Sequence, residues 1–390
     1  MRNKKFLLIF YVTFIILFFL TSLYFSQYLF SRIFLLILLS ILITFLIIKV
    51  ENRLYLHKDD TSLSYDYLDI ARFVGAIIII ILHLRPFLNH FNPLDITFNN
   101  IISRICVPLY FLITGYFVAK KEPNNSNYIK DYIKSNIPLY LLWSLIYLPL
   151  GLDYIAQLNL PIYLYPVALI ISLVYIGTYY HLWYFPALFL SLWILKVWKK
   201  HFKLSILLFI SFILLCLGAT ETYYGLLPIS LQDALTKYYF NIFYTTRNFL
   251  FFGLFYVTLG YHIGQKKQSF VPHSFFKMLL SLLALILEVI FLQATHRLNS
   301  NIMFACIPLV YYLFITLIHL GPLFKKRHLY RPLSKYYYLV HPLIIFISQN
   351  YLFHYYTNQP FIELGVVLLA THLLSLLLIY IKPYLKKIPI

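Results

Sequence analysis

Long apolar runs separated by short polar segments form the main pattern of this chain. Residues 6–20 and 33–48, for example, contain almost no polar side chain. A membrane-spanning helix needs roughly 20 apolar residues, because only a helix satisfies its own backbone within hydrocarbon. The pattern predicts an all-α, polytopic transmembrane helical bundle of about twelve spans. We expect these spans near residues 6–24, 30–48, 68–88, 101–119, 136–152, 182–199, 203–219, 247–264, 275–294, 302–320, 336–354 and 362–381.

The composition excludes a soluble globular protein. Of the 390 residues, 61% are hydrophobic and 12% are charged, whereas about 25% of the residues of a soluble domain are charged. Cys106, Cys216 and Cys306 lie far apart inside apolar runs, so we expect neither a metal site nor a disulfide framework. The first apolar run lacks a small-residue cleavage site, which indicates a retained helix and not a signal peptide.

The basic residues indicate the orientation of the chain in the membrane. The formal net charge is +19, but Lys and Arg lie in short loops between apolar runs, which favours a role in topology over nucleic-acid binding. With twelve spans in a cell membrane, the basic clusters and both termini fall on the cytoplasmic side. A thirteenth span at 162–177 would move every later basic cluster to the outer side of the membrane. We therefore predict that this stretch is interfacial or re-entrant on the outer face.

The longest segment outside the predicted spans covers about residues 220–246 and lies on the outer side in this topology. It carries five tyrosines, Tyr223, Tyr224, Tyr238, Tyr239 and Tyr244. These side chains fit an aromatic belt at the membrane surface. A platform for sugar rings is the alternative.

Arg72 and His83 are the first candidates for a functional site, because ionisable residues at membrane depth are costly. They are separated by about three helical turns, so they share one face of a helix roughly 16 Å apart. We place Arg72 near the cytoplasmic boundary and His83 in the outer half of the membrane. The alternatives are an intrahelical pair of Arg72 with Asp69 and a hydrogen bond from His83 to a neighbouring helix.

Two further ionisable residues lie inside late spans. His341 follows Lys335 by six residues, which predicts the same cytoplasmic-side depth as that of Arg72. Glu288 is the acid well inside a late span, and it needs a cationic partner or a proton. Both are candidates for substrate binding.

A third group of candidates lies toward the outer side. Arg104, His181 and Arg247 each stand at the end of a predicted span, and Trp183 follows His181 by two residues. Such residues often serve only as interfacial anchors. Together they can also hold an acceptor that enters from outside.

Five motifs occur in a fixed order along the chain. They are Arg72-x10-His83, VPLYFLITGYF at 107–117, HLWYF at 181–185, TRNFLFFG at 246–253 and YLVHP at 338–342. Together they resemble the acyltransferase-3 family of integral membrane proteins, over about residues 65–382. On this basis we divide the chain into two additional N-terminal transmembrane helices (1–60) and an acyltransferase-3-like membrane domain (61–390) of about ten spans. The same core is similar to the membrane domain of the serine racemases of vancomycin resistance, whose racemase half has no counterpart in this sequence.

The resemblance implies the transfer of an acyl group, usually acetyl, from cytoplasmic acyl-CoA to a hydroxyl of an extracytoplasmic glycan. It also implies that Arg72 and His83 are essential. Acyl-CoA (acetyl-CoA) is then the donor substrate, and no permanently bound cofactor is expected. The Lys-, Ile-, Tyr- and Phe-rich composition is typical of an AT-rich bacterial genome. We therefore expect a cell-wall or capsular polysaccharide, or a teichoic acid, as acceptor, with membrane lipid around the protein.

The residue types fit the same chemistry. His83 is the candidate base, because an imidazole titrates near neutral pH. Arg72 is a fixed cation that can clamp the donor or polarise the thioester carbonyl. His341 can orient the donor or relay a proton. The sequence has no Ser or Cys nucleophile motif, which favours direct transfer or a histidine intermediate.

A transporter or flippase is the competing class, since such proteins also bury Arg and His along a pathway. Its cargo would be a small polar solute such as serine, or a polysaccharide. Transporters typically show internal repeats and paired Gly- or Pro-broken helices. This chain shows no clear repeat, and we expect Pro86, Pro108, Pro138 and Pro186 mostly to mark helix ends. The pattern therefore favours an enzyme.

Overall fold

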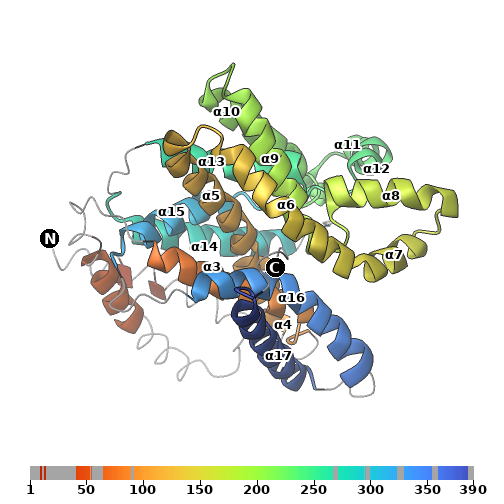
Figure 1. The fold of residues 1–390 in the computed structure, drawn as a ribbon. Helices are drawn as coiled ribbons and strands as arrows, with labels where there is room; N and C mark the ends of the chain where they lie inside the picture. Colours follow the sequence, from red (N-terminus) through yellow and green to blue (C-terminus); the bar gives the residue numbers. More distant parts are fainter. Residues whose placement is uncertain are drawn as a thin grey trace.

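The computed structural model describes a helical protein (Figure 1). The described residues are 9–10, 13–14, 41–52, 54, 65–88, 92–266, 271–293, 295, 299–322, 329–353 and 359–384. Within these ranges all regular secondary structure is helical and no strand occurs. The all-α class predicted from the apolar pattern is thus confirmed for the part of the chain that the structure covers.

Each predicted span from residue 68 onward coincides with a helix or with two consecutive helices. The main helices are α3 (Asp66–Leu84), α4 (Asn92–Ile96), α5 (Ser103–Lys121), α6 (Tyr128–Ile146), α7 (Leu148–Gln157), α8 (Tyr165–Ile171), α9 (Tyr184–Trp198), α10 (Leu204–Ala219), α11 (Ile229–Ala234), α12 (Phe240–Phe243), α13 (Leu254–Gln265), α14 (Ser274–Gln293), α15 (Cys306–His319), α16 (Tyr330–Ile347) and α17 (Pro360–Ile381). Short π-helical turns extend several of them, namely η1 (Thr97–Ile102), η4 (Ser172–Ile176), η6 (Leu235–Tyr239), η7 (Phe249–Gly253) and η8 (Ser348–Leu352). Single 3-10 turns are η2 (Glu122–Asn124), η3 (Ile162–Leu164) and η5 (Tyr224–Leu226). The first two predicted spans, 6–24 and 30–48, lie mostly outside the described residues.

Four of the described helices are long and apolar enough to cross a membrane, or five if α6 and α7 form one bent span. The four are Asp66–Leu84, Asn92–Asn124, Ser274–Gln293 and Pro360–Ile381. Four more are apolar but shorter: Ile162–Ile176, Tyr184–Trp198, Leu204–Ala219 and Cys306–His319. These helices support a membrane protein, while the count of about twelve spans stays a prediction.

The chain bends by 62° between α6 and α7. Pro149 stands in the first turn of α7 and has no amide hydrogen to donate to the carbonyl of the preceding turn. Beyond the bend, α7 and α8 form an arm at the side of the bundle (Figure 1). The apolar stretch Ile162–Ile176 lies in this arm and is shorter than a full span. Its interfacial or re-entrant placement stays a prediction.

Two prolines differ from the prediction that prolines mark helix ends. Pro108 lies inside α5 and Pro138 lies inside α6. A proline inside a helix frees the carbonyl four residues earlier, which a neighbouring side chain can satisfy. At Pro108 the freed carbonyl is that of Arg104, and it accepts a hydrogen bond from the Cys306 thiol, with a sulfur–oxygen distance of 3.8 Å.

Glycines allow α5 and α13 to pack with their backbones in contact. A Cβ on Gly115 would lie 2.1 Å from the carbonyl oxygen of Val257, and a Cβ on Gly260 would lie 2.0 Å from that of Leu112. Gly264 follows Gly260 by four residues on the same face, the spacing that membrane helices use for close approach. This contact brings the central turn of α5 against the helix that follows the TRNFLFFG motif.

We expect Gly260→Leu to prevent normal assembly of the bundle. A leucine side chain cannot occupy a site where even a Cβ meets backbone atoms, and overpacking of this kind costs about 1–3 kcal/mol or more. The thermal midpoint of the detergent-solubilised protein, followed by size-exclusion chromatography after heating, should fall by several degrees or the protein should aggregate. Gly365→Leu is the matched control, because a Cβ there has no neighbouring atom within 4 Å. Equal stability of the two variants would contradict this account of the α5–α13 contact.

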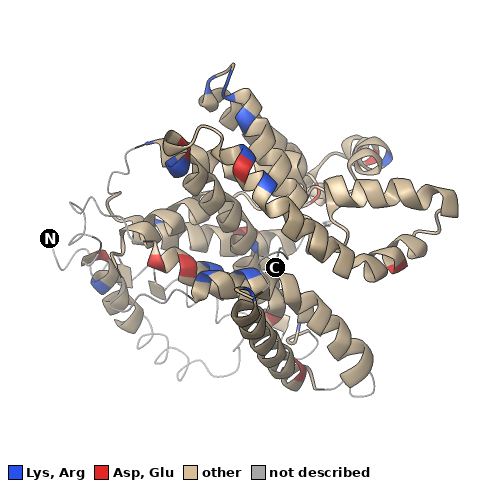
Figure 2. Cartoon of the chain, viewed as in Figure 1, with Lys and Arg blue, Asp and Glu red and all other residues tan. Residues whose placement is uncertain are grey.

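Lys and Arg are distributed unevenly over the molecule. Figure 2 shows them gathered at the turn between α9 and α10, at the end of α5 and near the start of α16. The arm of α7 and α8 carries one charged residue, Asp153. This asymmetry is the one that the predicted orientation requires; the cytoplasmic placement of the termini itself stays a prediction.

Candidate active site

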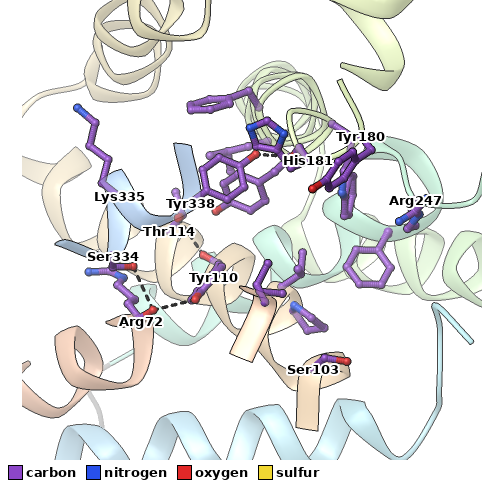
Figure 3. A pocket seen from close by; sticks show the side chains of 18 of the residues that line it. Arg72, Ser103, Tyr110, Thr114, Tyr180, His181, Arg247, Ser334, Lys335 and Tyr338 are labelled. Atoms are coloured by element: carbon purple, nitrogen blue, oxygen red, sulfur yellow. Dashed lines mark hydrogen bonds between the residues drawn. The ribbon is translucent and has the colours of Figure 1, made fainter. Parts of the chain in front are cut away.

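A cavity of about 310 Å³ lies within the helical bundle, between α3, α5, α6, α9, η7 and α16. Six of the residues predicted from the sequence line it: Arg72, His83, Arg104, His181, Trp183 and Arg247. They come from segments far apart in the chain, and Figure 3 shows several of them around the same space. The fold therefore brings together residues that were selected one by one.

Arg72 lies at one end of the cavity, together with two basic residues of α16. Its guanidinium donates to Asp69, with 2.9 Å between Nη1 and Oδ1, so the intrahelical pair considered as an alternative is present at a cavity-lining residue. Arg331 and Lys335 line the same cavity one helical turn apart. Both belong to one of the basic clusters that the predicted topology places on the cytoplasmic side, and their spacing of four puts them on one face of a helix.

The backbone of Arg72 is held by side chains from two other helices. Its carbonyl oxygen accepts from the Tyr110 hydroxyl at 2.8 Å and from the Ser334 hydroxyl at 3.0 Å (Figure 3). A Cβ at residue 75 would lie 2.5 Å from the Tyr110 hydroxyl, so Gly75 permits this approach. The three helices α3, α5 and α16 are thus joined at the turn that carries Arg72.

Three histidines meet in the middle of the site. The rings of His83 and His341 stack with 5.5 Å between centroids and 17° between planes. The ring of His181 lies 5.8 Å from that of His341, and the ring of Tyr180 lies 4.6 Å from that of His83. His341 therefore belongs to the site through its contacts with two cavity-lining histidines.

The prediction that His341 lies at the depth of Arg72 is wrong. We placed the start of its span near residue 336, but α16 begins at Tyr330, so His341 lies about three turns into the helix. Ser334, and not His341, is level with Arg72, since it bonds the Arg72 carbonyl. His341 is instead level with His83.

The hydrogen bonds of His341 define its tautomer. Its Nδ1 lies 2.7 Å from the carbonyl oxygen of Tyr337, and because a carbonyl can only accept, Nδ1 carries the proton. Nε2 is then the nitrogen with the free lone pair. Within the described residues, neither this nitrogen nor either ring nitrogen of His181 has a hydrogen-bond partner, although both rings are buried. Buried polar atoms left unpaired cost about 1–3 kcal/mol each. The His181 ring lines the cavity and the His341 ring packs against it, an arrangement typical of a site for a polar substrate.

Two tyrosine hydroxyls fix the backbone around the histidines. Since Pro342 lacks an amide hydrogen, α16 is weakened directly after His341. The Tyr147 hydroxyl lies between two backbone groups of this turn: it accepts from the amide of Leu343 at 3.1 Å and donates to the carbonyl of Leu339 at 2.8 Å. The Tyr338 hydroxyl donates to the carbonyl of His181 at 2.5 Å.

Arg247 lies in a loop that is anchored on both sides. The side chain of Asn248 caps η7, with its Oδ1 2.8 Å from the amide nitrogen of Leu250. The hydroxyl of Thr246 donates to the buried carboxylate of Glu221 at 2.7 Å. Burial raises the pKa of Glu221 above its ordinary value, while the hydrogen bonds from Thr246 act in the opposite direction. These anchors hold Arg247 at the cavity.

Arg104 and Glu288 have different surroundings. Arg104 lines the cavity, and its Nη1 donates to the Asn301 side chain at 3.4 Å. Glu288 is not among the lining residues. Its carboxylate accepts from the amide nitrogens of Phe304 at 2.8 Å and Ala305 at 2.9 Å, and from the Tyr223 hydroxyl. It thus caps the start of α15. These hydrogen-bond donors take the place of the cationic partner or the proton that the sequence predicts for Glu288.

The charges that line the cavity are all of one sign. Its basic residues are Arg72, Arg104, Arg247, Arg331 and Lys335, and no acidic residue is found among the described residues that line it. Such a lining attracts an anionic substrate and disfavours a cationic one. The basic side chains stand at both ends, and the three histidines lie between them.

Comparisons with known proteins agree with the motifs. A sequence model described as "Acyltransferase domain" (Acyl_transf_3) matches residues 65–380. The serine/alanine racemase of Enterococcus gallinarum is 29% identical over 307 residues, which cover 73% of this chain and 42% of that protein. An amino-acid racemase of Enterococcus faecalis is 27% identical over 296 residues, covering 73% of this chain and 41% of that protein. The chain thus spans less than half the length of these curated relatives. No solved structure matches the chain significantly.

Proposed function

Because the chain belongs to the acyltransferase-3 family of membrane proteins, we propose that it is an O-acyltransferase of the cell envelope. It moves an acyl group, preferably acetyl, from cytoplasmic acyl-CoA to a hydroxyl of an extracytoplasmic glycan. The observation that carries the proposal is that one cavity is lined both by the basic residues Arg72, Arg331 and Lys335 and by the histidines His83 and His181. The racemase names belong to the relatives and describe proteins more than twice as long as the matched part.

The basic end of the cavity fits the donor. Acyl-CoA is rich in phosphate, and Arg and Lys bind phosphate through charge-assisted hydrogen bonds. Arg331 is exposed, whereas the side chain of Arg72 is only 16% exposed. We therefore assign the phosphates to Arg331 and Lys335 at the mouth, and the inner part of the donor to Arg72.

Arg72 lies too far from His83 to take part in the chemical step. Eleven residues of helix place the Cα atoms of Arg72 and His83 roughly 16 Å apart, and an arginine side chain spans less than half of that distance. A thioester held beside His83 is then out of reach of the Arg72 guanidinium. Of the two roles considered for Arg72, clamping the donor is favoured over polarising the carbonyl. The ring of Tyr180 packs beside that of His83, and the Tyr180 hydroxyl is our candidate donor to the developing oxyanion.

Direct transfer requires one proton acceptor at the histidine cluster. His83 takes the proton of the acceptor hydroxyl while the oxygen attacks the thioester carbon. The carbon–sulfur bond breaks, and the proton passes to the leaving thiolate, which gives an O-acyl glycan and free CoA thiol. The lone pair on Nε2 of His341 can accept a proton beside His83 and serve as a relay.

The test uses cells with and without the gene. Base-labile acyl groups are released from purified envelope glycans, with a cell-wall or capsular polysaccharide or a teichoic acid as the expected acceptor, and are quantified. We expect one acyl ester to be lost in the deletion and restored by the gene on a plasmid. Unchanged ester content together with reduced solute uptake or reduced glycan export would instead support a transporter or flippase.

A further inference from the structure

A second cavity, of about 240 Å³, is also lined by His83. It is lined by His83, by Tyr179 and Tyr180, by Pro342, Ile345 and Phe346 of α16, and by Gln349 of η8. His83 and Tyr180 line both cavities. A substrate in either space therefore meets the same imidazole and the same phenol.

We propose that this second cavity binds the sugar ring that bears the accepting hydroxyl, and that this ring is uncharged. The inference rests on the proposed acyltransferase function. It places the donor in the large cavity and the acceptor in the small one, with His83 in the wall between them.

The lining of the second cavity suits a neutral polyol. Tyr179, Tyr180 and Phe346 offer aromatic faces, and Gln349 offers an amide that both donates and accepts hydrogen bonds. No Lys, Arg, Asp or Glu lines this cavity in the described part of the chain. A charged ring would lose its hydration there without gaining a counter-ion. The large cavity, with its basic lining, is the better place for the phosphates of the donor.

The size of the second cavity restricts the ligand to about one ring. Sites for drug-sized ligands measure roughly 300–1,000 Å³, and this cavity of 240 Å³ is smaller. One wall is held by packing, because the ring of Tyr179 stacks on that of Tyr147 with 5.2 Å between centroids and 8° between planes. A preformed space of this kind favours one sugar unit over an extended oligosaccharide.

The proposed donor and acceptor sites lie toward opposite ends of α16. Arg331 and Lys335 lie in its first two turns, and the exposed Gln349 lies just past its end, in η8. The 18 residues from Arg331 to Gln349 correspond to roughly 27 Å of helix, which approaches the thickness of the hydrocarbon core. In the predicted orientation, Arg331 faces the cytoplasm and Gln349 faces the outside. The neighbouring Ser348 hydroxyl donates to Glu363 of α17 at 3.2 Å and holds this end in place.

The test compares ester formation with donor binding. Phe346→Ala and Gln349→Leu are expressed in the deletion strain, glycan-bound ester is quantified, and the affinity of each purified full-length protein for acetyl-CoA is measured. We expect ester formation to fall at least tenfold while the affinity for acetyl-CoA stays within twofold of wild type. Phe346→Tyr, which keeps the aromatic face, should retain ester formation. Ile347→Ala is the matched control, because Ile347 is exposed and lies outside the cavity lining.

Each outcome has a distinct meaning. Normal ester formation in Phe346→Ala and Gln349→Leu would overturn the inference and leave the proposed function intact. Loss of acetyl-CoA affinity in both variants would assign the small cavity to the donor and overturn it as well. If the wild-type protein forms no ester, the proposed function itself fails. The ester-bearing fragment should be an uncharged sugar; an ester on a uronate or on a polyol between phosphodiesters would contradict the proposed ligand class.

Discussion

His83→Gln is expected to reduce acyl transfer by a factor of about 10² to 10⁴, the range that a positioned general base contributes. Glutamine has a similar length and keeps hydrogen-bonding capacity, but it cannot accept a proton near neutral pH. The stacked ring of His341 remains in this variant, so the size of the loss also shows how far His341 can replace His83. The measurement is the initial rate of glycan ester formation by purified protein at saturating acetyl-CoA.

The matched control for this change is His201→Gln. His201 lies exposed in the turn between α9 and α10, and it is not among the residues that line either cavity. Its replacement should leave the rate within twofold of wild type. A His83→Gln enzyme that retains more than a third of the wild-type rate would contradict the role of His83 as base.

Arg72→Lys is expected to impair the use of the donor more than the chemical step. A lysine keeps the charge but loses the planar fork with which arginine binds Asp69 and an anionic substrate together. Because Arg72 is too far from His83 to touch the reacting carbonyl, the loss should appear as a KM for acetyl-CoA raised about 10-fold to 100-fold, with a smaller change in kcat. Steady-state kinetics with acetyl-CoA as the varied substrate provide the measurement.

Arg247→Lys is the counterpart at the other end of the cavity. Arg247 lines the same cavity but is held by the loop around Thr246 and Asn248. This change should leave the KM for acetyl-CoA near the wild-type value. If both variants raise this KM equally, or if Arg72→Lys lowers kcat alone, the assignment of the Arg72 end to the donor is wrong.

The sequence predicted the helices and six members of the cavity lining. Membrane depth makes an ionisable residue costly, so Arg72 and His83 stand out within an apolar run without any structural knowledge. Arg104, His181 and Arg247 were candidates because each stands at the end of a predicted span, and Trp183 because it follows His181 by two residues. Their convergence on one cavity could not be derived from spacing, because it depends on how α5, α9 and η7 pack against α3.

The role of α16 was harder to predict from the sequence. Arg331 and Lys335 belong to a basic cluster that the positive-inside rule alone accounts for. Nothing in the sequence therefore marked these two residues as part of a cavity. The helix begins at Tyr330, six residues before the predicted span, and this shift moves His341 from the level of Arg72 to that of His83. The bonds of Tyr110, Ser334 and Tyr147 to backbone atoms depend on the tertiary register of neighbouring helices. No local pattern encodes that register.

Glu288 shows the limit of the rule that buried charge indicates function. An acid inside an apolar helix was a reasonable candidate, yet backbone amides at the start of α15 and the Tyr223 hydroxyl meet its hydrogen-bonding needs. Capping of this kind joins residues that are 16 and 17 positions apart in sequence. It could not be distinguished from a substrate site before the packing of α14 on α15 was known.

Transfer across a sealed membrane tests the central claim most directly. The full-length protein is reconstituted into lipid vesicles that enclose purified envelope glycan, and acetyl-CoA labelled in the acetyl group is supplied outside. The account predicts that label accumulates as base-labile ester on the enclosed glycan with the wild-type protein and not with His83→Gln. Glycan that crosses the membrane without gaining label would contradict the acyltransferase account and identify the cavity as a transport pathway.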